Sequence, residues 1–374
     1  MNQQKGLEGV VAAQTAISDI DVENSCLLYA GYNVTDLVHH STFEEVIYLL
    51  HHRELPTSAQ LEQITAQLSA ERDLSEFTRQ LMVTLASTTS PMSMLRTLVS
   101  AASAYDPDGW VVSTNHAANY RKAIRLVARL PQMIASHERL RGGKWPVEPD
   151  PKLGHAANLL YVLTGEYPSD EDARIMDQCL VMHADHTMNA STFAARVTAG
   201  TLSDIHSAMT SAIATLKGPL HGGANEQVFE MILKIGSVEA VPEDIKGRLA
   251  RKEKIMGFGH RVYKGEDPRA TILRELARDL GARKGDMKWF DISEKIFEVV
   301  KTEKGLFPNV DFYAAAVYHY LGIPKRLFTP IFAASRIAGW TAHVIEQLQN
   351  NRLIRPDSEY IGPGPRDYVK VEDR

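Results

Sequence analysis

The sequence has few cysteines: only Cys26 and Cys179 occur among 374 residues. Both lie in apolar runs, so we expect two buried thiols rather than a disulfide, which a chain with a large core does not need. No stretch reaches the roughly 18 uninterrupted apolar residues of a membrane span. The first residues also lack the basic segment and apolar region of a signal peptide. We therefore expect a cytoplasmic chain with no membrane partner.

A strong excess of one charge is also missing. The 41 Lys and Arg residues against 46 Asp and Glu give a net charge of −5. This mild acidity argues against nucleic acid as a partner, since nucleic-acid-binding proteins usually carry a basic surface. A hydrophobic content of 44% excludes a mainly disordered chain. The length allows about two domains.

Strand-like alternation is scarce, whereas apolar residues recur at spacings of three and four along most of the chain. Ser41–Glu44 and Thr57–Gln60 have the pattern of capping boxes, which predicts that helices begin there. The two best strand candidates are Gly9–Ala12 and Leu27–Gly31. The sequence therefore predicts an all-α protein with a small N-terminal β element.

Two histidines stand beside glycines. His221 lies in Gly218-Pro-Leu-His-Gly-Gly-Ala-Asn225, and His260 directly follows Gly257-Phe-Gly259. Glycine and proline disfavour a helix interior, so each histidine is expected at a helix end or tight turn, where backbone can approach a ligand. The alternative for His221 is that it only forms hydrogen bonds with backbone groups at a helix start. The alternative for His260 is that it lies in a solvent-exposed basic turn.

Three cations, Arg261, Lys264 and Arg269, follow His260 closely. Cations beside flexible backbone favour an anionic ligand such as a phosphate or carboxylate. A dinucleotide-binding motif is excluded, because Val262 stands where a third glycine is needed and no strand precedes the segment.

Asp311 and Arg336 are isolated charges in apolar segments. Asp311 is either a simple helix cap or, in a water-poor cleft, a general base with a raised pKa. An arginine in a nearly uncharged helix is costly unless an anion pairs with it, so Arg336 binds either a distant acid or a ligand.

His183 and His186 are three residues apart with Asp185 between them. The usual helical zinc motif has histidines four apart with a glutamate, and no third ligand is suitably spaced here. No metal site is predicted; packing or a substrate-facing role is favoured for these histidines.

These segments, in this order, resemble the citrate synthase family. The resemblance rests on His183-Ala-Asp-His-Thr-Met-Asn-Ala-Ser-Thr-Phe193, the His221 and His260 motifs, Asp267-Pro-Arg-Ala270, Asn309-Val-Asp-Phe-Tyr313 and Phe328-Thr-Pro-Ile-Phe-Ala-Ala-Ser-Arg-Ile-Ala-Gly-Trp340. With Gly6-Leu-Glu-Gly-Val10 it extends over nearly the whole chain. It implies a two-domain helical homodimer, with a large domain from residues 1–222 and 329–374 and a small domain from residues 223–328.

The implied reaction joins acetyl-CoA to oxaloacetate and then hydrolyses the thioester. By resemblance, Asp311 removes a methyl proton while His221 hydrogen-bonds the thioester oxygen, and His260 polarises the ketone of oxaloacetate. His186, Arg269, Arg336 and Arg355 match the residues that bind oxaloacetate, with Arg355 reaching the partner subunit's site. Domain closure would exclude water during the enol stage.

Coenzyme A needs an adenine cradle and phosphate partners. Gly257, Phe258 and Gly259 are candidates for the adenine, and Arg261 and Lys264 for the phosphates. The implied reaction requires no metal or redox cofactor. The chain is similar to the shorter members of the family, so no inhibitory NADH site is expected.

Three alternatives remain open at this stage. A 2-methylcitrate synthase would use propionyl-CoA with the same motifs, because one methylene in an acyl pocket is worth only about 1–3 kcal/mol. A helical protein that binds an acidic metabolite without catalysis would release no CoA. A histidine-based metal hydrolase would lose activity with a chelator.

Overall fold

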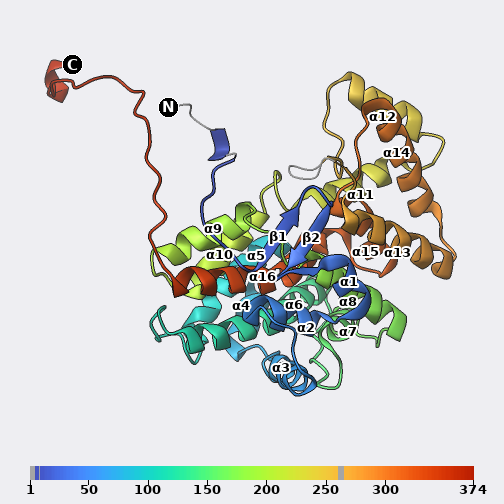
Figure 1. The fold of residues 1–374 in the computed structure, drawn as a ribbon, viewed down its shortest axis with the longest axis horizontal. Coiled ribbons are helices and arrows are strands. Elements are labelled where there is room, and N and C mark those ends of the chain that lie inside the picture. Colours follow the sequence, from blue (N-terminus) through green and yellow to red (C-terminus); the bar gives the residue numbers. More distant parts are fainter. Residues whose placement is uncertain (1–4, 8, 260–264) are drawn as a thin grey trace.

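The computed structural model describes residues 5–7, 9–259 and 265–374. Within these ranges the chain forms sixteen α-helices and one small sheet, which confirms the all-α class with a small β element (Figure 1). None of the helices in the described part of the chain has both the length and the apolar character needed to cross a membrane.

The elements before the long sixth helix are β1 (Ser18–Asp21), β2 (Cys26–Tyr29), β3 (Tyr32–Asn33), α1 (Val34–His40), α2 (Phe43–His52), α3 (Ser58–Ala70), α4 (Glu76–Leu85) and α5 (Pro91–Ala102). They are followed by α6 (His116–Arg141), α7 (His155–Thr164), α8 (Asp170–His183), α9 (Ala190–Gly200) and α10 (Ile205–Leu216). The remaining helices are α11 (Ala224–Ile235), α12 (Val241–Ala250), α13 (Pro268–Lys284), α14 (Lys288–Lys304), α15 (Val310–Tyr320) and α16 (Phe328–Gln349). Short 3-10 turns occupy Lys5–Leu7, Ser103–Tyr105, Lys325–Leu327 and Val371–Asp373.

The sheet is antiparallel with strand order β1-β2-β3. Ser18 pairs with Tyr29, and Leu28 pairs with Asn33. The strand expected at Leu27–Gly31 corresponds to β2, but the one expected at Gly9–Ala12 is wrong. That segment is exposed and irregular, because β1 takes the position beside β2 and no described strand lies next to residues 9–12.

Capping residues define the helix starts closely. Thr57 caps α3 and forms the predicted box with Gln60. The box at α2 is shifted by one residue: Thr42 is the cap and Glu45 its partner. Ser41 instead donates its hydroxyl hydrogen to the Leu37 carbonyl at the end of α1. A hydroxyl and an acid at the right spacing therefore predicted the helix, although not its first residue.

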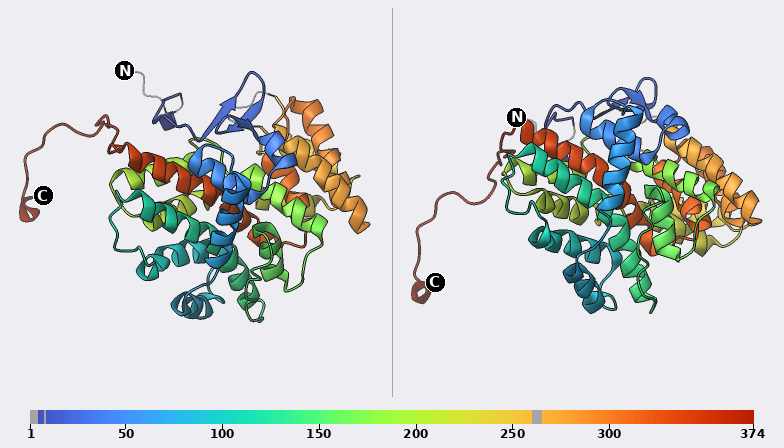
Figure 2. Two further views of the ribbon diagram at one scale, coloured as in Figure 1. Left: turned by 60° about the horizontal axis from the view of Figure 1, so that its bottom comes forward. Right: turned by 90° about the horizontal axis from the view of Figure 1, so that it is seen from below.

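Helix α16 lies at the centre of the larger helical group (Figures 1 and 2). It packs against α6, α8, α9 and α10, and nearly all of its residues are buried. Because buried polar groups need hydrogen-bond partners, the few polar side chains of α16 must find theirs inside the protein.

The helices α11 to α15 gather at one side of the molecule (Figure 1). Within this group α13 and α11 pack on α15, and α12 packs on α14. The chain then returns to the larger group as α16, which also contacts α11. This arrangement agrees with the discontinuous division at residues 222 and 328, whose boundaries stay a prediction.

The C-terminal residues 355–374 leave the body as an exposed tail (Figure 2). Large apolar side chains along it are exposed to solvent: Tyr360 at 77%, Ile361 at 92% and Tyr368 at 82%. The tail therefore buries little apolar surface within its own chain.

The backbone of helix α16 lies in direct contact with the backbone of the turn after α8. The Gly339 N–H donates to the Ala184 carbonyl over 3.1 Å. A Cβ atom on Gly339 would lie 2.5 Å from that same carbonyl oxygen and would also overlap the Asp185 carboxylate. Only glycine allows this approach, because any side chain would meet backbone that cannot yield.

We expect Gly339→Ala to destabilise the fold by at least about 2 kcal/mol, the range of a severe overpacking. Gly142→Ala is the matched control, since its new Cβ would meet only ordinary contacts of 3.5 and 3.6 Å. Thermal unfolding of both variants measures the difference. Equal melting temperatures would show that α16 and the turn can move apart at little cost.

Candidate active site

A cavity of about 560 Å³ opens between α16, the start of α15 and the turns that precede α9 and α11. Five of the predicted site residues line it: His186, His221, Arg269, Asp311 and Arg336. These residues are up to 150 positions apart in the sequence, from His186 to Arg336. The fold thus collects isolated polar groups from five segments around one space.

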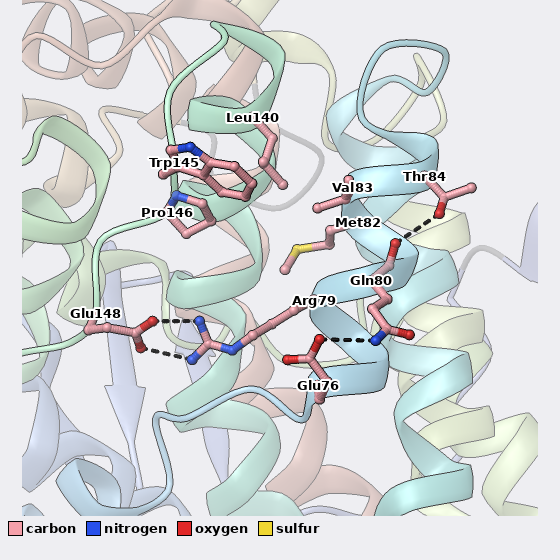
Figure 3. A pocket seen from close by; sticks show the side chains of 10 residues that line it. All are labelled: Glu76, Arg79, Gln80, Met82, Val83, Thr84, Leu140, Trp145, Pro146 and Glu148. Carbon is pink, nitrogen blue, oxygen red and sulfur yellow. Dashed lines mark hydrogen bonds and ion pairs between the residues drawn. The ribbon is translucent and has the colours of Figure 1, made fainter.

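A second cavity, between α4 and the loop after α6, holds none of these residues (Figure 3). Its arginine, Arg79, donates to both carboxylate oxygens of Glu148 over 2.6 and 2.8 Å. Gln80 donates to Glu76 over 3.0 Å. Because the charges in this cavity are largely paired with one another, it is not the candidate site.

Asp311 lies in the first turn of α15, one residue after the helix begins. The helix cap is Asn309, whose side-chain oxygen accepts the Asp311 N–H over 3.1 Å. The alternative that Asp311 itself is a simple cap is therefore wrong. Its Oδ1 atom is shielded from solvent and has no hydrogen-bond partner in the described part of the chain.

Burial raises the pKa of Asp311 to about 6, although Arg269 and Arg336 favour the charged form. A carboxylate that lacks hydrogen bonds at one oxygen keeps that oxygen available to accept a proton. A pKa near 6 leaves the group ionised at neutral pH and brings its basicity closer to what a general base needs.

His221 lies in a tight turn between α10 and α11, as predicted for a histidine beside proline and glycines. The Gly222 N–H donates to the Leu216 carbonyl over 2.9 Å, and a Cβ on Gly222 would lie 2.5 Å from that oxygen. The close return of the chain therefore requires glycine after His221.

The His221 ring has a defined orientation. Its Nε2 atom lies 2.7 Å from the Ser191 Oγ and 3.3 Å from the Ser191 backbone N. A backbone N–H can only donate, so Nε2 is the acceptor. Burial lowers the pKa of His221 to about 4, which keeps the ring neutral at physiological pH. A neutral ring with Nε2 as acceptor carries its hydrogen on Nδ1.

Arg269 is only 2% exposed. It stands at the start of α13, where Asp267 is the helix cap. Its guanidinium donates to both Asp267 carboxylate oxygens over 3.0 and 2.8 Å. The pair places a fixed cation at the cavity wall, because both side chains are buried and hold each other in a bidentate geometry.

Arg336 is equally buried at 2% exposure and projects from α16. Its Nε donates to the His183 carbonyl over 2.7 Å, and its guanidinium carbon lies 4.6 Å from the centre of the Phe332 ring. In the described part of the chain no carboxylate forms an ion pair with it. The alternative of a structural salt bridge is not supported, and a ligand carboxylate remains the better partner.

His186 and His183 have different surroundings. His186 lines the cavity. His183 is fully buried, bonds the Cys179 carbonyl through Nδ1 over 2.8 Å and packs edge-on against Phe332. Of the two histidines, only His186 is therefore placed to face a substrate. No group of three or more His, Cys, Asp or Glu side chains in the described ranges is arranged to hold a metal ion.

Of the residues predicted for coenzyme A, Gly257, Phe258 and Gly259 lie beside the cavity. The Asn309 N–H donates to the Gly257 carbonyl over 2.9 Å, and the Gly259 N–H donates to the Phe307 carbonyl over 3.0 Å. Phe258 is 6% exposed and packs against Phe312. Residues 257–259 are thus joined to the segment that leads into Asp311. His260, Arg261 and Lys264 lie outside the described residues.

Arg355 is not part of the cavity within this chain. It lies in the extended tail, with its side chain 76% exposed and 3.2 Å from the Asp357 carboxylate. A role in a second subunit's site is compatible with this position, because the tail leads away from the body (Figure 1).

Sequence reasoning did not single out three residues that hold the site. Ser191 binds His221, Trp340 donates its indole N–H to Ser191 Oγ over 3.0 Å, and Asn309 caps the helix of Asp311. All three lie within the motifs quoted above. Their roles depend on contacts between distant segments, so only the cap, from Asn preceding an apolar run, had a local signal.

The chain belongs to the citrate synthase family. The family model described as "Citrate synthase, C-terminal domain" matches residues 6–357. A citrate synthase 2 of Bacillus subtilis is 48% identical over 100% of both chains. A citrate synthase of Haloferax volcanii is 48% identical over 99% of each. A 2-methylcitrate synthase of Shewanella oneidensis is 41% identical over 99% of this chain and 97% of its own.

Solved structures show the same likeness. The structure of citrate synthase from Pyrobaculum aerophilum has a TM-score of 0.93 and 42% identity, covering 99% of this chain and 95% of its own. The citrate synthase of Thermoplasma acidophilum, solved as a ternary complex with carboxymethyl coenzyme A and oxaloacetate, has a TM-score of 0.93 and 32% identity, covering 99% of each chain. The fold and family inferred from the motifs are confirmed.

Asp311→Asn should make the folded protein more stable at neutral pH. The folded-state pKa, about 6, exceeds the usual 3.8, so wild-type stability falls as pH rises through this window and stays reduced above it. The variant lacks this penalty, and we expect a gain of about 3 kcal/mol at pH 7.5 that vanishes below pH 4.

Thermal unfolding of both proteins at pH 4 and pH 7.5 measures this difference. Asp357→Asn, whose carboxylate is 96% exposed, is the control and should change nothing at either pH. A variant that is no more stable than wild type at pH 7.5 would contradict a desolvated Asp311.

Proposed function

We propose that this chain condenses acetyl-CoA with oxaloacetate and hydrolyses the resulting thioester to citrate and CoA. One observation carries the proposal. Asp311, whose Oδ1 has no hydrogen-bond partner among the described residues, lines one cavity together with the neutral His221 and the buried cations Arg269 and Arg336. A base, a hydrogen-bond donor and two carboxylate-binding groups are what an enol condensation with a dicarboxylate requires.

Oxaloacetate is a dianion, and the cavity offers it Arg269, Arg336 and His186. Arginine suits carboxylates because its planar fork can donate two parallel hydrogen bonds. Arg336 has no carboxylate partner in the described part of the chain, so a substrate carboxylate would not displace an existing ion pair there.

Asp311 would remove a proton from the methyl group of acetyl-CoA. The methyl group is a very weak acid, so the base alone is insufficient, and charge must be stabilised on the thioester oxygen. His221 is oriented for this task, since its Nδ1–H is available while Ser191 holds Nε2. A donor fixed in place before charge develops lowers the barrier most effectively.

The enol would then attack the ketone carbon of oxaloacetate, forming the carbon–carbon bond and leaving an alkoxide that takes up a proton. By resemblance His260, outside the described residues, polarises this carbonyl and supplies the proton. Water would finally attack the thioester carbonyl and release CoA as the thiol. The proposed steps need no metal or redox cofactor.

Coenzyme A would bind beside residues 257–259, with Arg261 and Lys264 as candidates for its phosphates. Support comes from the backbone bonds that join Gly257 and Gly259 to the segment leading into Asp311. The Thermoplasma acidophilum structure contains a coenzyme A derivative together with oxaloacetate, the same pair of ligand classes. A cytoplasmic location and the lack of an NADH site stay predictions.

The same cavity would serve propionyl-CoA, and relatives named 2-methylcitrate synthase are 41% and 42% identical to this chain. The citrate synthases among the relatives reach 48%, which favours acetyl-CoA. We therefore keep 2-methylcitrate formation as the second candidate, to be distinguished by rate.

Thiol release with acetyl-CoA and with propionyl-CoA, each with oxaloacetate, tests the proposal directly. We expect the higher kcat/KM for acetyl-CoA and a loss of at least about 100-fold in Asp311→Asn, since deleting a general base removes that much or more. Asp279→Asn is the control, because this side chain on α13 is 62% exposed and away from the cavity, and it should retain full activity.

Each other outcome selects an alternative. A higher kcat/KM for propionyl-CoA would make the chain a 2-methylcitrate synthase. If the wild type releases no thiol, the protein is better explained as a binding protein. If a chelator inhibits the reaction, a metal enzyme is favoured. An Asp311→Asn enzyme within a few-fold of wild type would remove Asp311 from the mechanism.

We further propose a homodimer in which Arg355 of each chain completes the partner's oxaloacetate site. The extended tail with exposed Tyr360, Ile361 and Tyr368 supports this, because such side chains bury well only against another surface. Arg355 is nearly unburied within its own chain, so its charge is available to a neighbour.

Mixed dimers of Arg355→Leu and Asp311→Asn chains test this arrangement. If Arg355 acts across the interface, one site of each mixed dimer keeps both groups intact. Refolding equal amounts together should then restore about a quarter of wild-type activity, since half of the dimers are mixed. No recovery over the separate variants would place Arg355 in its own subunit's site or in none.

A further inference from the structure

A line of buried polar side chains runs from α9 through α16 to the turn that carries His186. Arg196 lies on α9 and His343 on α16, and Asp185 directly precedes His186 in the chain. Arg196 is 3% exposed, and His343 and Asp185 are not exposed at all. The mechanism proposed above uses none of the three, yet the cost of burying them requires a compensating role.

The hydrogen bonds along this line have one consistent direction. Arg196 Nη1 lies 3.1 Å from His343 Nδ1, and His343 Nε2 lies 3.3 Å from Asp185 Oδ2. Arginine can only donate, so Nδ1 of His343 accepts. The hydrogen of the neutral ring is then on Nε2 and is donated to the Asp185 carboxylate.

Asp185 also stabilises the turn that follows it through hydrogen bonds. Its Oδ2 also accepts the Ser18 hydroxyl hydrogen from β1 and the Thr187 N–H over 3.0 Å. Its backbone N–H donates to the Tyr29 hydroxyl over 3.1 Å, and that hydroxyl donates to the Asp185 carbonyl over 3.0 Å. The residue before His186 is thus tied to β1, β2 and α16.

The residue after His186 is strained. Thr187 has a φ of +51°, a left-handed conformation that a β-branched side chain rarely adopts. Such a conformation persists only where the surroundings impose it. Here the Thr187 N–H is bonded to both Asp185 Oδ2 and Ser18 Oγ, so the Asp185 carboxylate supplies that constraint.

The same carboxylate supports the charge of Arg336. Burial opposes the ionisation of Asp185, but His343 and Arg336 keep its pKa below the usual value. The charges of the half-buried Glu346 and of the buried Arg196, Asp185 and Arg336 alternate in sign, with Glu346 2.8 Å from Arg196. Arg336 also donates to the carbonyl of His183, the last residue of α8 before this turn, so the end of α8 and its turn hold two of the proposed substrate ligands.

We propose that His343 is a positioning residue: through Asp185 it fixes the strained turn that presents His186 and Arg336 to the substrate. The kinetic part of this inference rests on the proposed function, whereas its structural part does not. His343 touches neither substrate nor reacting atoms, and acts by joining Arg196 to Asp185.

Three variants test the proposal in the full-length protein. His343→Leu removes both hydrogen bonds, whereas His343→Gln can accept from Arg196 with its oxygen and donate to Asp185 with its amide. His155→Leu is the matched control, because His155 is 2% exposed and neither ring nitrogen has a hydrogen-bond partner in the described part of the chain. All three remove one buried imidazole.

We expect His343→Leu to lower kcat/KM for oxaloacetate about 100-fold, the scale of a small misplacement of binding groups, with KM for acetyl-CoA within about 3-fold of wild type. His343→Gln should recover to within about 3-fold of wild type. His155→Leu should leave both kinetic constants unchanged, because it removes a buried ring that forms no hydrogen bond within the described residues. If His343→Leu behaves like His155→Leu, the proposal is wrong.

Nitrogen-15 NMR of labelled histidines supplies a readout that does not need activity. The wild type should show His343 as the neutral Nε2–H tautomer, and the His186 ring signals should shift in His343→Leu but not in His155→Leu. Unchanged His186 signals would overturn the proposal even if the wild type proved inactive. Should His343→Leu not fold, Ser18→Ala is the second variant, and unchanged His186 signals there would overturn the proposal as well.

Discussion

The packing of α16 against the turn after α8 is the contact on which the site depends. Gly339 brings the two backbones into hydrogen-bond contact, and no other residue fits there. The contact buries Asp185 completely. A buried carboxylate is tolerated only with hydrogen bonds and a nearby cation, and His343 and Arg336 on the same helix meet that requirement. Helix α16 therefore both packs the core and positions the side chains on one wall of the cavity.

The two arginines of the cavity differ in how closely a carboxylate neutralises them, and this difference affects how a substrate anion would bind. Arg269 forms an ion pair with Asp267, two residues before it in the chain, whereas Arg336 is balanced through space by Asp185 and Asp311. Burial raises the pKa of Asp311, and both arginines favour its charged form. An arriving dianion would compensate Arg336 at little cost. The net charge of −5 hides this local excess of positive charge.

The sequence predicted those parts of the fold that depend on residues close together in the chain, above all the helices and their caps. Helices follow from apolar spacing, and Thr57 and Gln60 cap α3 as expected. The prediction of a strand at residues 9–12 was wrong, because a strand needs a partner strand to pair with and sequence alternation does not identify that partner. The cap at Thr42 rather than Ser41 shows the same limit at the scale of one residue, since two hydroxyls compete and the end of α1 takes one.

The site could be predicted in part for a physical reason. Asp311 and Arg336 are conspicuous because a charge in an apolar segment has a high cost that some function must justify. Asp185 and His343 carry no such signal, because Asp185 stands among histidines in a polar segment and a histidine can be buried in an apolar helix as a neutral ring. Their meaning arises from a contact across 158 residues of sequence. Asp311 and Arg336 are visible as isolated charges in their own segments, whereas the role of His343 becomes visible only when the fold brings Arg196 and Asp185 to its two ring nitrogens.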